Sequence, residues 1–158
     1  MTKNILIFRT DRIGDLLLNC PIIISLKNHF KLSKIYLVTS NKNSEYAKSL
    51  QIFDQVYQFP SKGLIKKINF ILQLSKKKFD YIFIFDGKDR SIISSAFIKS
   101  NNKFAITSNK KNNFLCALLK IKFERDNEGT NLESIYKKIK ENLKIETTEN
   151  NYDFLNKK

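Results

Sequence analysis

The sequence contains few of the residues that build metal sites and disulfide scaffolds, and it has no long apolar run. Its two cysteines are Cys20 and Cys116 and its only histidine is His29, so we expect no zinc site and no other bound metal. Two distant cysteines do not make the dense disulfide framework of a small secreted domain, which indicates buried, reduced thiols in a cytoplasmic protein. No run of about 18 apolar residues occurs, and the run from Ile5 to Phe8 is short, so neither a transmembrane helix nor a signal peptide is expected.

Acidic residues are also scarce, with 15 against 29 lysines and arginines and a formal net charge of +14. Such an excess indicates an anionic partner: a phosphorylated sugar, a membrane surface or nucleic acid. Only four of the basic residues are arginines, at positions 9, 12, 90 and 125. Because bidentate recognition of phosphate and guanine favours arginine, nucleic acid is the least favoured of these partners. A solvated lysine surface with no partner stays open as an alternative.

Short apolar runs alternate with helical patterns along the 158 residues, a length typical of one domain. Strands are expected at residues 4–9, 34–39, 55–59, 81–85 and 103–107, and helices at about 15–30, 43–50, 91–98 and 130–143. A further helix is expected after Ser61, which can cap it, with apolar residues at 64, 65, 68, 71 and 72. Strands alternating with helices predict an α/β fold with a parallel sheet and helices on both faces.

Three local signals refine these boundaries. Pro21 predicts a kink or a delayed start in the first helix. Thr130 and Glu133 form a capping box for the last helix. The domain is expected to span residues 1–145, and residues 146–158 are polar, which is typical of a tail or of the start of an interdomain linker.

Two expected loops gather residue types that are scarce elsewhere in the chain. One runs from Arg9 to Asp15 after the first strand, and the other from Phe85 to Ser91 after the fourth. Together they hold two of the four glycines and three of the four arginines. Since ligands of open parallel sheets bind beyond the carboxyl ends of the strands, we predict the functional site there. Neither loop contains a standard dinucleotide, P-loop or nucleophile-elbow motif.

The first loop has the chemistry of an anion site. Gly14 at a strand-to-helix turn permits a positive φ or a close approach of the backbone to a ligand. The following helix N-terminus offers free N–H groups and the positive end of the helix dipole. Asp15 would lie in the first helical turn, where the dipole favours the ionised form that a general base requires. The alternative stays open that Asp15 only caps the helix and Gly14 only turns the chain.

The second loop also allows two interpretations. Asp86 and Asp89 can be paired carboxylates, with Lys88 and Arg90 binding an anion. Alternatively, the segment is a polar turn in which Asp89 caps the next helix.

The opening NILIFRTDRIGDLLLNCPIIISLKNHF resembles the start of glycosyltransferase family nine, the lipopolysaccharide heptosyltransferases. The shared features are a strand, the R-x-D-R-I-G-D turn from Arg9 to Asp15, the apolar residues 16–18 and a helix containing Pro21. The later segments KIYLVTS, IFDQVYQF and FDYIFIFDGKDRS are similar to the family's second, third and fourth strands. The resemblance covers about residues 3–145.

The resemblance implies a GT-B type glycosyltransferase, in which two Rossmann-like domains face a cleft. In that family the N-terminal domain binds the acceptor and the C-terminal domain holds most of the nucleotide-sugar site. Residues 1–145 would then be the N-terminal, acceptor-side domain, and the donor-binding domain would be absent from this chain. We therefore expect the chain to be inactive alone. Four alternatives stay open: a truncated gene product, half of a split enzyme completed by a C-terminal half in trans, a fragment of a longer protein, or a degenerate remnant.

The resemblance also implies a reaction. The family transfers heptose from an ADP-activated donor to a lipopolysaccharide-core acceptor, with inversion and without an essential metal or cofactor, and the matching catalytic general base is Asp15. The positions expected to bind donor phosphate or acceptor are Thr10, Arg12, Ile13, Gly14, Asp86, Gly87, Lys88 and Arg90. The implied partners are an ADP-heptose-like donor and an anionic glycolipid acceptor, with peripheral contact at the inner face of the inner membrane.

Other functions stay open from the sequence. One is a non-catalytic binding module for an anionic glycan or a nucleotide. A less favoured one is a basic nucleic-acid-binding domain, whose affinity would fall steeply with salt.

Overall fold

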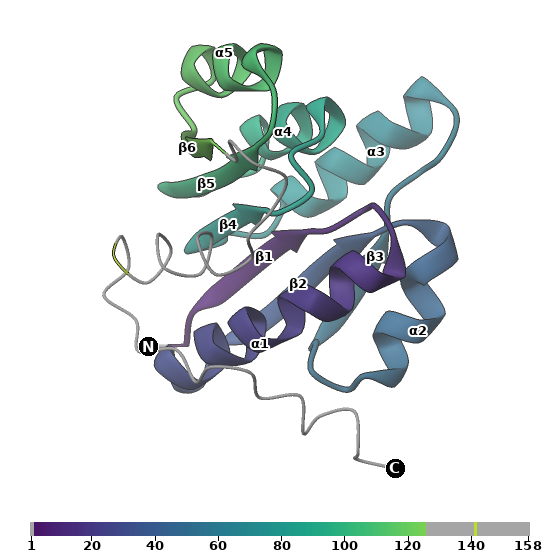
Figure 1. Cartoon of the computed structure of the whole chain (residues 1–158). Helices are drawn as coiled ribbons and strands as arrows, with labels where there is room; N and C mark the ends of the chain where they lie inside the picture. Colours follow the sequence, from purple (N-terminus) through teal and green to yellow (C-terminus); the bar gives the residue numbers. More distant parts are fainter. Residues whose placement is uncertain (1, 126–140, 142–158) are drawn as a thin grey trace.

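The computed structural model describes residues 2–125 and residue 141 of the chain (Figure 1). Strands and helices alternate through the described part. The strands are β1 (Asn4–Phe8), β2 (Lys34–Thr39), β3 (Gln55–Gln58), β4 (Tyr81–Ile84), β5 (Asn102–Thr107) and β6 (Lys122–Arg125). The helices are α1 (Ile13–His29), α2 (Ser44–Ser49), α3 (Leu64–Ser75), α4 (Asp89–Ala96) and α5 (Lys110–Leu118), with a 3-10 turn, η1 (Asn41–Asn43), before α2.

The six strands form one parallel sheet in the order β3-β2-β1-β4-β5-β6. The chain starts at the centre with β1, steps outward to β2 and β3, and then returns across β1 to β4 (Figure 1). The strand order therefore reverses between β1 and β4. In open α/β sheets this reversal leaves a crevice at the carboxyl ends of the two strands, where ligands bind. The α/β fold predicted from the sequence is confirmed.

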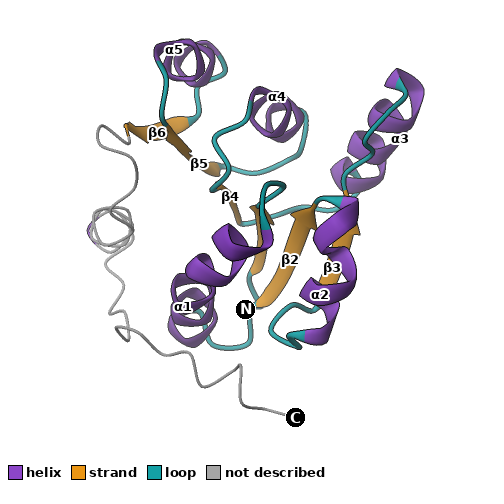
Figure 2. Ribbon diagram, turned by 45° about the vertical axis from the view of Figure 1, so that its right-hand side comes forward, coloured by secondary structure: helices purple, strands orange, loops and turns teal. Residues whose placement is uncertain are grey.

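Helices cover both faces of the sheet because the central strands are apolar on both sides. On one face, Ile5 and Ile7 of β1 pack with Leu26 of α1 and Ala47 of α2. Helices α3, α4 and α5 cover the other face (Figure 2). There Leu6 and Phe8 pack with Phe70, Ile92 and Cys116. Both cysteines are buried and free, as the sequence predicted. None of the described helices is long and apolar enough to cross a membrane.

Two helix starts differ from the sequence-based expectation. Helix α1 begins at Ile13 and continues through Pro21 to His29, so the delayed start was wrong. Proline lacks a backbone N–H, so the helix loses one hydrogen bond at Pro21. The Pro21 ring is buried, and its packing offsets the lost hydrogen bond. The N-cap of α3 is Gly63 rather than Ser61. The helix expected at residues 130–143 and the tail at 146–158 lie outside the described residues.

The sequence reading missed α5 and β6. Helix α5 is short and rich in lysine and asparagine, so its apolar periodicity is weak. Its start is nevertheless marked by an N-cap, since the Asn109 side chain accepts a hydrogen bond from the Asn112 amide at 2.8 Å. Strand β6 completes the edge of the sheet beside β5.

Helix α3 has its apolar residues on two sides. Phe70 and Leu74 are buried against the sheet. The residues that gave the helix its sequence signature are largely exposed: Leu64, Ile65, Ile68 and Leu72. An amphipathic helix normally turns such a stripe toward the core, whereas α3 presents it to solvent in the described part of the chain.

Candidate functional site

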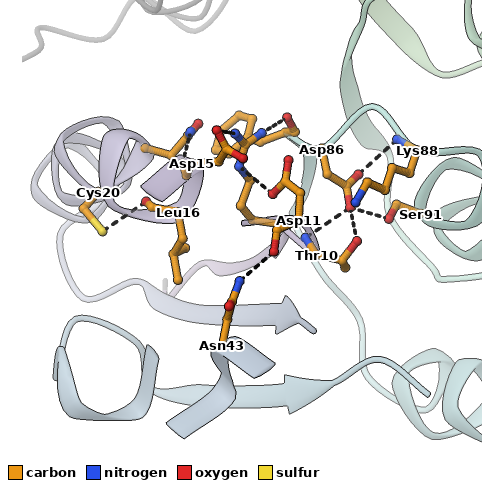
Figure 3. Close-up of polar contacts among 12 residues, drawn as sticks. Thr10, Asp11, Asp15, Leu16, Cys20, Asn43, Asp86, Lys88 and Ser91 are labelled. Atoms are coloured by element: carbon orange, nitrogen blue, oxygen red, sulfur yellow. Dashed lines mark hydrogen bonds and ion pairs between the residues drawn. The ribbon is translucent and has the colours of Figure 1, made fainter. Parts of the chain in front are cut away.

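The loops after β1 and β4 meet at the strand-order reversal, and the Asp86 carboxylate joins them (Figure 3). Asp86 Oδ2 accepts hydrogen bonds from the Thr10 hydroxyl at 2.6 Å, the Thr10 amide at 3.2 Å and the Ser91 hydroxyl at 2.7 Å. Its other oxygen accepts a bond from the Lys88 amide at 3.2 Å. One carboxylate thus fixes the first loop, its own turn and the first helical turn of α4.

Arg9 is the second link between the loops, and its guanidinium is almost fully buried at 11% exposure. It donates a hydrogen bond to the carbonyl oxygen of Phe85 at the end of β4. Its Nε lies 3.1 Å from Asp11 Oδ1, without hydrogen-bond alignment, and its Nη2 lies 3.7 Å from Asp15 Oδ1. A buried guanidinium needs such partners because an unpaired buried charge is costly. Arg9 therefore fixes both carboxylates of the first loop relative to β4.

Asp15 is the more accessible of these two carboxylates, with 39% of its side chain exposed. It is the third residue of α1, whose N-cap is Arg12, and the Arg12 side chain makes no capping bond. Among the described residues, the Asp15 carboxylate pairs with the Arg9 guanidinium. This pairing does not support the interpretation that Asp15 only caps the helix. The Arg9 guanidinium and the N-terminus of α1 both place positive charge beside this carboxylate.

Asp11 has a different environment from Asp15. Burial raises the pKa of Asp11, and the neighbouring Asp86 and Asp15 carboxylates add to the rise, while Arg9 opposes it. The Asp11 carbonyl accepts a hydrogen bond from the Asn43 side chain at 2.7 Å, which ties the first loop to η1. Asp11 is thus a half-buried structural partner of Arg9, with 20% of its side chain exposed, and Asp15 is the more accessible carboxylate.

The two loop glycines have different roles. Gly87 has a φ of +54°, and a Cβ added there would lie 2.5 Å from the carbonyl oxygen of Ile106, so only glycine fits. Asn112 donates a hydrogen bond to the Gly87 carbonyl and holds the turn against α5. Gly14 lies within α1, where no positive φ occurs, and a Cβ added there meets nothing within 4 Å. The space beside Gly14 is open to a ligand.

The three cations of the predicted site are placed differently. The Arg90 guanidinium donates to the Thr10 hydroxyl at 2.8 Å and to the Thr10 carbonyl at 3.2 Å, and it lies 5.4 Å from the centre of the Phe59 ring. Arg12 is exposed and Lys88 half-buried, and neither pairs with a carboxylate in the described part of the chain. Arg12 and Lys88 are therefore available to an anion, whereas Arg90 is engaged in holding Thr10.

The structure places the predicted site residues at one edge of the sheet, on two loops and the starts of two helices. Asp86 and Asp89, which the sequence allowed to be paired carboxylates, have different partners. Asp89 forms an ion pair with Lys111, whereas Asp86 accepts hydrogen bonds from Thr10 and Ser91. The expectation that Asp89 caps the next helix was wrong, because the N-cap of α4 is Lys88.

Sequence reasoning did not identify the supporting roles of three residues, Arg9, Asp11 and Ser91. For Arg9 a signal was available in the scarcity of arginine. In a chain this rich in lysine, arginine is expected where a rigid, multidentate donor is required. In the described residues no group of three histidine, cysteine, aspartate or glutamate side chains is arranged to hold a metal ion.

The sequence matches no protein-family model, and no curated protein matches it. Solved structures do match. The E. coli heptosyltransferase WaaC with ADP aligns over 96% of this chain and 51% of its own, with a TM-score of 0.74 and 13% identity. A glycosyl transferase family 9 structure from Veillonella parvula aligns over 91% of this chain and 42% of its own, with a TM-score of 0.70 and 19% identity.

A third similar structure is the E. coli ADP-heptose lipopolysaccharide heptosyltransferase II, with a TM-score of 0.57 and 10% identity over 66% of this chain. At these identities the likeness shows the fold. The chain has the Rossmann-like α/β fold found in these GT-B glycosyltransferases, which confirms the fold that the opening motif implied. The chain spans about half the length of WaaC, 51%.

Proposed function

We propose that this chain is the acceptor-side domain of an inverting glycosyltransferase that uses a nucleotide-sugar donor of the ADP-heptose type. The observation that carries the proposal is the placement of Asp15. Its carboxylate is accessible, held by the buried Arg9, and located at a helix N-terminus at the strand-order reversal. The fold is shared with heptosyltransferases whose structures contain ADP or an ADP-heptose analogue.

In this proposal Asp15 is the catalytic general base. It accepts the proton of the acceptor hydroxyl while that oxygen forms a bond to the anomeric carbon of the donor sugar and the nucleoside diphosphate leaves. Arg9 acts as a positioning residue, because its buried guanidinium lies 3.7 Å from the Asp15 carboxylate. The proposed base is 39% exposed and paired with Arg9, which supports an approach of the acceptor hydroxyl from solvent.

The remaining site residues divide into two groups. Thr10, Asp86, Gly87 and Arg90 hold the two loops together. The open side of α1, at Ile13 and Gly14, presents backbone N–H groups that suit a diphosphate. The free cations Arg12 and Lys88 suit the negative groups of a phosphorylated glycan acceptor. Further cations for the leaving diphosphate would come from a donor-binding domain, which a complete enzyme of this kind requires.

The test joins this chain to the C-terminal domain of a heptosyltransferase with the same fold and measures transfer from ADP-heptose to a truncated lipopolysaccharide core. Asp15→Asn keeps the size of the side chain and removes its basicity, so kcat is expected to fall by about 10² to 10⁴-fold. The matched control is Glu45→Gln on α2, which removes one exposed carboxylate that pairs with Lys48 and leaves the site intact. Its kcat is expected to equal that of the unmodified fusion.

Equal activity of the Asp15→Asn and unmodified fusions would show that Asp15 is not the base. A fusion that binds the acceptor but transfers nothing, with all residues intact, would favour a binding module without turnover. Binding can be followed separately by titrating the acceptor glycan into the chain alone.

A further inference from the structure

A pocket of about 540 Å³ lies beside the end of α4, at the edge of the sheet opposite the candidate site. Helix α4 begins at Asp89, after the carboxyl end of β4, and ends at Ala96 (Figure 1). The pocket residues Lys78 and Lys103 lie just before β4 and at the start of β5. The eight residues of α4 span about 12 Å. The pocket is therefore separate from the site at Asp15, and its volume is in the range of small-molecule sites.

The lining of this pocket is cationic. Three of its eight residues are lysines, Lys78, Lys99 and Lys103, and none is acidic. None of the three forms an ion pair with a carboxylate in the described part of the chain. The Asp80 carboxylate, close to Lys78 in the chain, pairs instead with Lys3 at 3.0 Å. The three lysines thus bring positive charge to one pocket without a carboxylate partner among the described residues.

Lys103 is the most enclosed of these three side chains. It is half-buried, whereas Lys78 and Lys99 are exposed. Its Nζ donates a hydrogen bond to the carbonyl oxygen of Ala96 at 3.1 Å, in the last turn of α4. Burial lowers the pKa of Lys103, because the ammonium loses contact with water. An anion that enters the pocket would stabilise this partly desolvated charge.

The pocket also has an apolar wall. Ala96 is half-buried and Ile98 is buried, and both line the pocket beside Phe97. Phe97 is the C-cap residue of α4, and 66% of it is exposed. Aromatic side chains pack well against other planar rings. The lining therefore combines point charges that suit a phosphate with a ring that suits a planar group.

From these observations we propose that the pocket at the end of α4 binds a small phosphate ester that carries a planar group, such as a nucleoside monophosphate. The ammonium groups of Lys78, Lys99 and Lys103 bind the phosphate, and the planar group packs on Phe97. A phosphate ester fits better than a carboxylate, because its charge near neutral pH approaches two and matches several lysines. The ligand occupies the edge of the sheet away from Asp15, so the inference does not depend on the proposed transferase activity.

The test labels the lysines of the whole chain with pyridoxal 5′-phosphate. The neutral amine of a lysine attacks the aldehyde carbon of the probe, and loss of water leaves an imine. Borohydride then adds hydride to that carbon while the nitrogen takes a proton from solvent, so the label becomes permanent and peptide mass spectrometry gives its position. Pyridoxal, which has the aldehyde and lacks the phosphate, serves as the second probe.

Lys103 is expected to carry more label than the exposed lysines, because the pocket holds the phosphate of the probe beside its amine. This excess should be about tenfold larger with pyridoxal 5′-phosphate than with pyridoxal, since only the first probe makes charge-assisted contacts. The comparison of the two probes removes the effect of the lowered Lys103 pKa, which is the same in both reactions. Adenosine 5′-monophosphate should protect Lys103 from the label, and adenosine should not.

The double variant Lys78→Gln with Lys99→Gln removes two phosphate contacts and should lower the excess at Lys103 about tenfold. The matched control is Lys31→Gln with Lys42→Gln, which removes the same net charge from two exposed lysines outside the pocket. The control should keep the excess, because distant exposed charges are screened.

A third variant, Phe97→Ala, tests the planar part of the ligand. It should weaken protection by adenosine 5′-monophosphate and leave protection by inorganic phosphate unchanged. Thermal unfolding checks that each variant folds, which the exposure of Phe97, Lys78 and Lys99 leads us to expect.

Three results would overturn the proposal. Equal label on Lys103 and on the exposed lysines would show that the pocket lysines form an ordinary solvated surface. An equal excess with both probes would show that the enclosed amine is reactive by itself and that Lys103 only binds the end of α4. An excess that falls equally in both double variants would show a general effect of net charge.

Discussion

The two loop glycines allow a test of the site architecture in which the same substitution has opposite consequences. Gly87→Ala places a Cβ 2.5 Å from the backbone oxygen of Ile106, and the next nearest atoms, at 3.5 Å, are also backbone atoms of Ile106 and Thr107. The turn cannot easily move away, because Asn112 holds the Gly87 carbonyl from α5. Gly14→Ala places its Cβ in open space within a helix.

The magnitudes follow from these geometries. At Gly87, a positive φ costs a non-glycine residue about 1–2 kcal/mol, and displacing packed backbone costs about 1–3 kcal/mol more. We expect the free energy of unfolding to fall by about 3 kcal/mol, and the unfolding temperature by roughly 10 °C in a domain of this size. At Gly14, alanine has the higher helix propensity, so stability should stay equal or rise by up to about 0.5 kcal/mol.

Urea denaturation of both variants, followed by circular dichroism, measures these changes. The same proteins can be titrated with the nucleotide-sugar or acceptor ligand. Gly14→Ala fills the space beside the start of α1, so it should weaken ligand binding while leaving stability intact. The tight packing against β5 would be refuted if the free energy of unfolding of Gly87→Ala lay within about 0.5 kcal/mol of the wild-type value. A difference of that size is what a Gly→Ala change produces at a position that tolerates alanine. A clear loss of stability in Gly14→Ala would refute the open space at α1.

Two further predictions concern pH and thiol chemistry. Burial raises the pKa of Asp80, but hydrogen bonds from the Asn4 amide and the Lys3 ammonium outweigh it and hold the pKa below its usual value. Its stabilisation should therefore be present above about pH 4 and be lost as the pH falls through the lowered pKa; the urea midpoint of Asp80→Asn should fall less over this range than that of wild type. Burial raises the pKa of Cys20 to about 12 and that of Cys116 to about 11, so at pH 8 a thiol reagent should label the folded protein only as fast as it unfolds. Rapid labelling before urea is added would contradict this burial.

The sequence alone determined most of the sheet and the fact that the two candidate loops lie at the same edge of it. Strands that are covered on both faces need continuous apolar runs, and NILIF and YIFI are such runs, so β1 and β4 were readable directly. Loop residues that follow parallel strands must lie at one edge of the sheet, so the segments at Arg9–Asp15 and Phe85–Ser91 could be placed together. Short segments without a strong apolar pattern, α5 and β6, could not be found in this way.

Only the tertiary structure decided how these residues interact. The bonds from Thr10 to Asp86 and from Arg9 to Phe85 join residues 76 positions apart in the chain. They exist because β4 lies beside β1, a strand order that local patterns do not encode. The exposed stripe of α3 has the same origin. Helical periodicity shows that Leu64, Ile65, Ile68 and Leu72 share one side of the helix, but it does not show which side packs on the sheet. Contacts with residues outside the helix decide that: the Phe70 ring packs against the rings of Tyr57 and Phe59, so Phe70 and Leu74 lie inward.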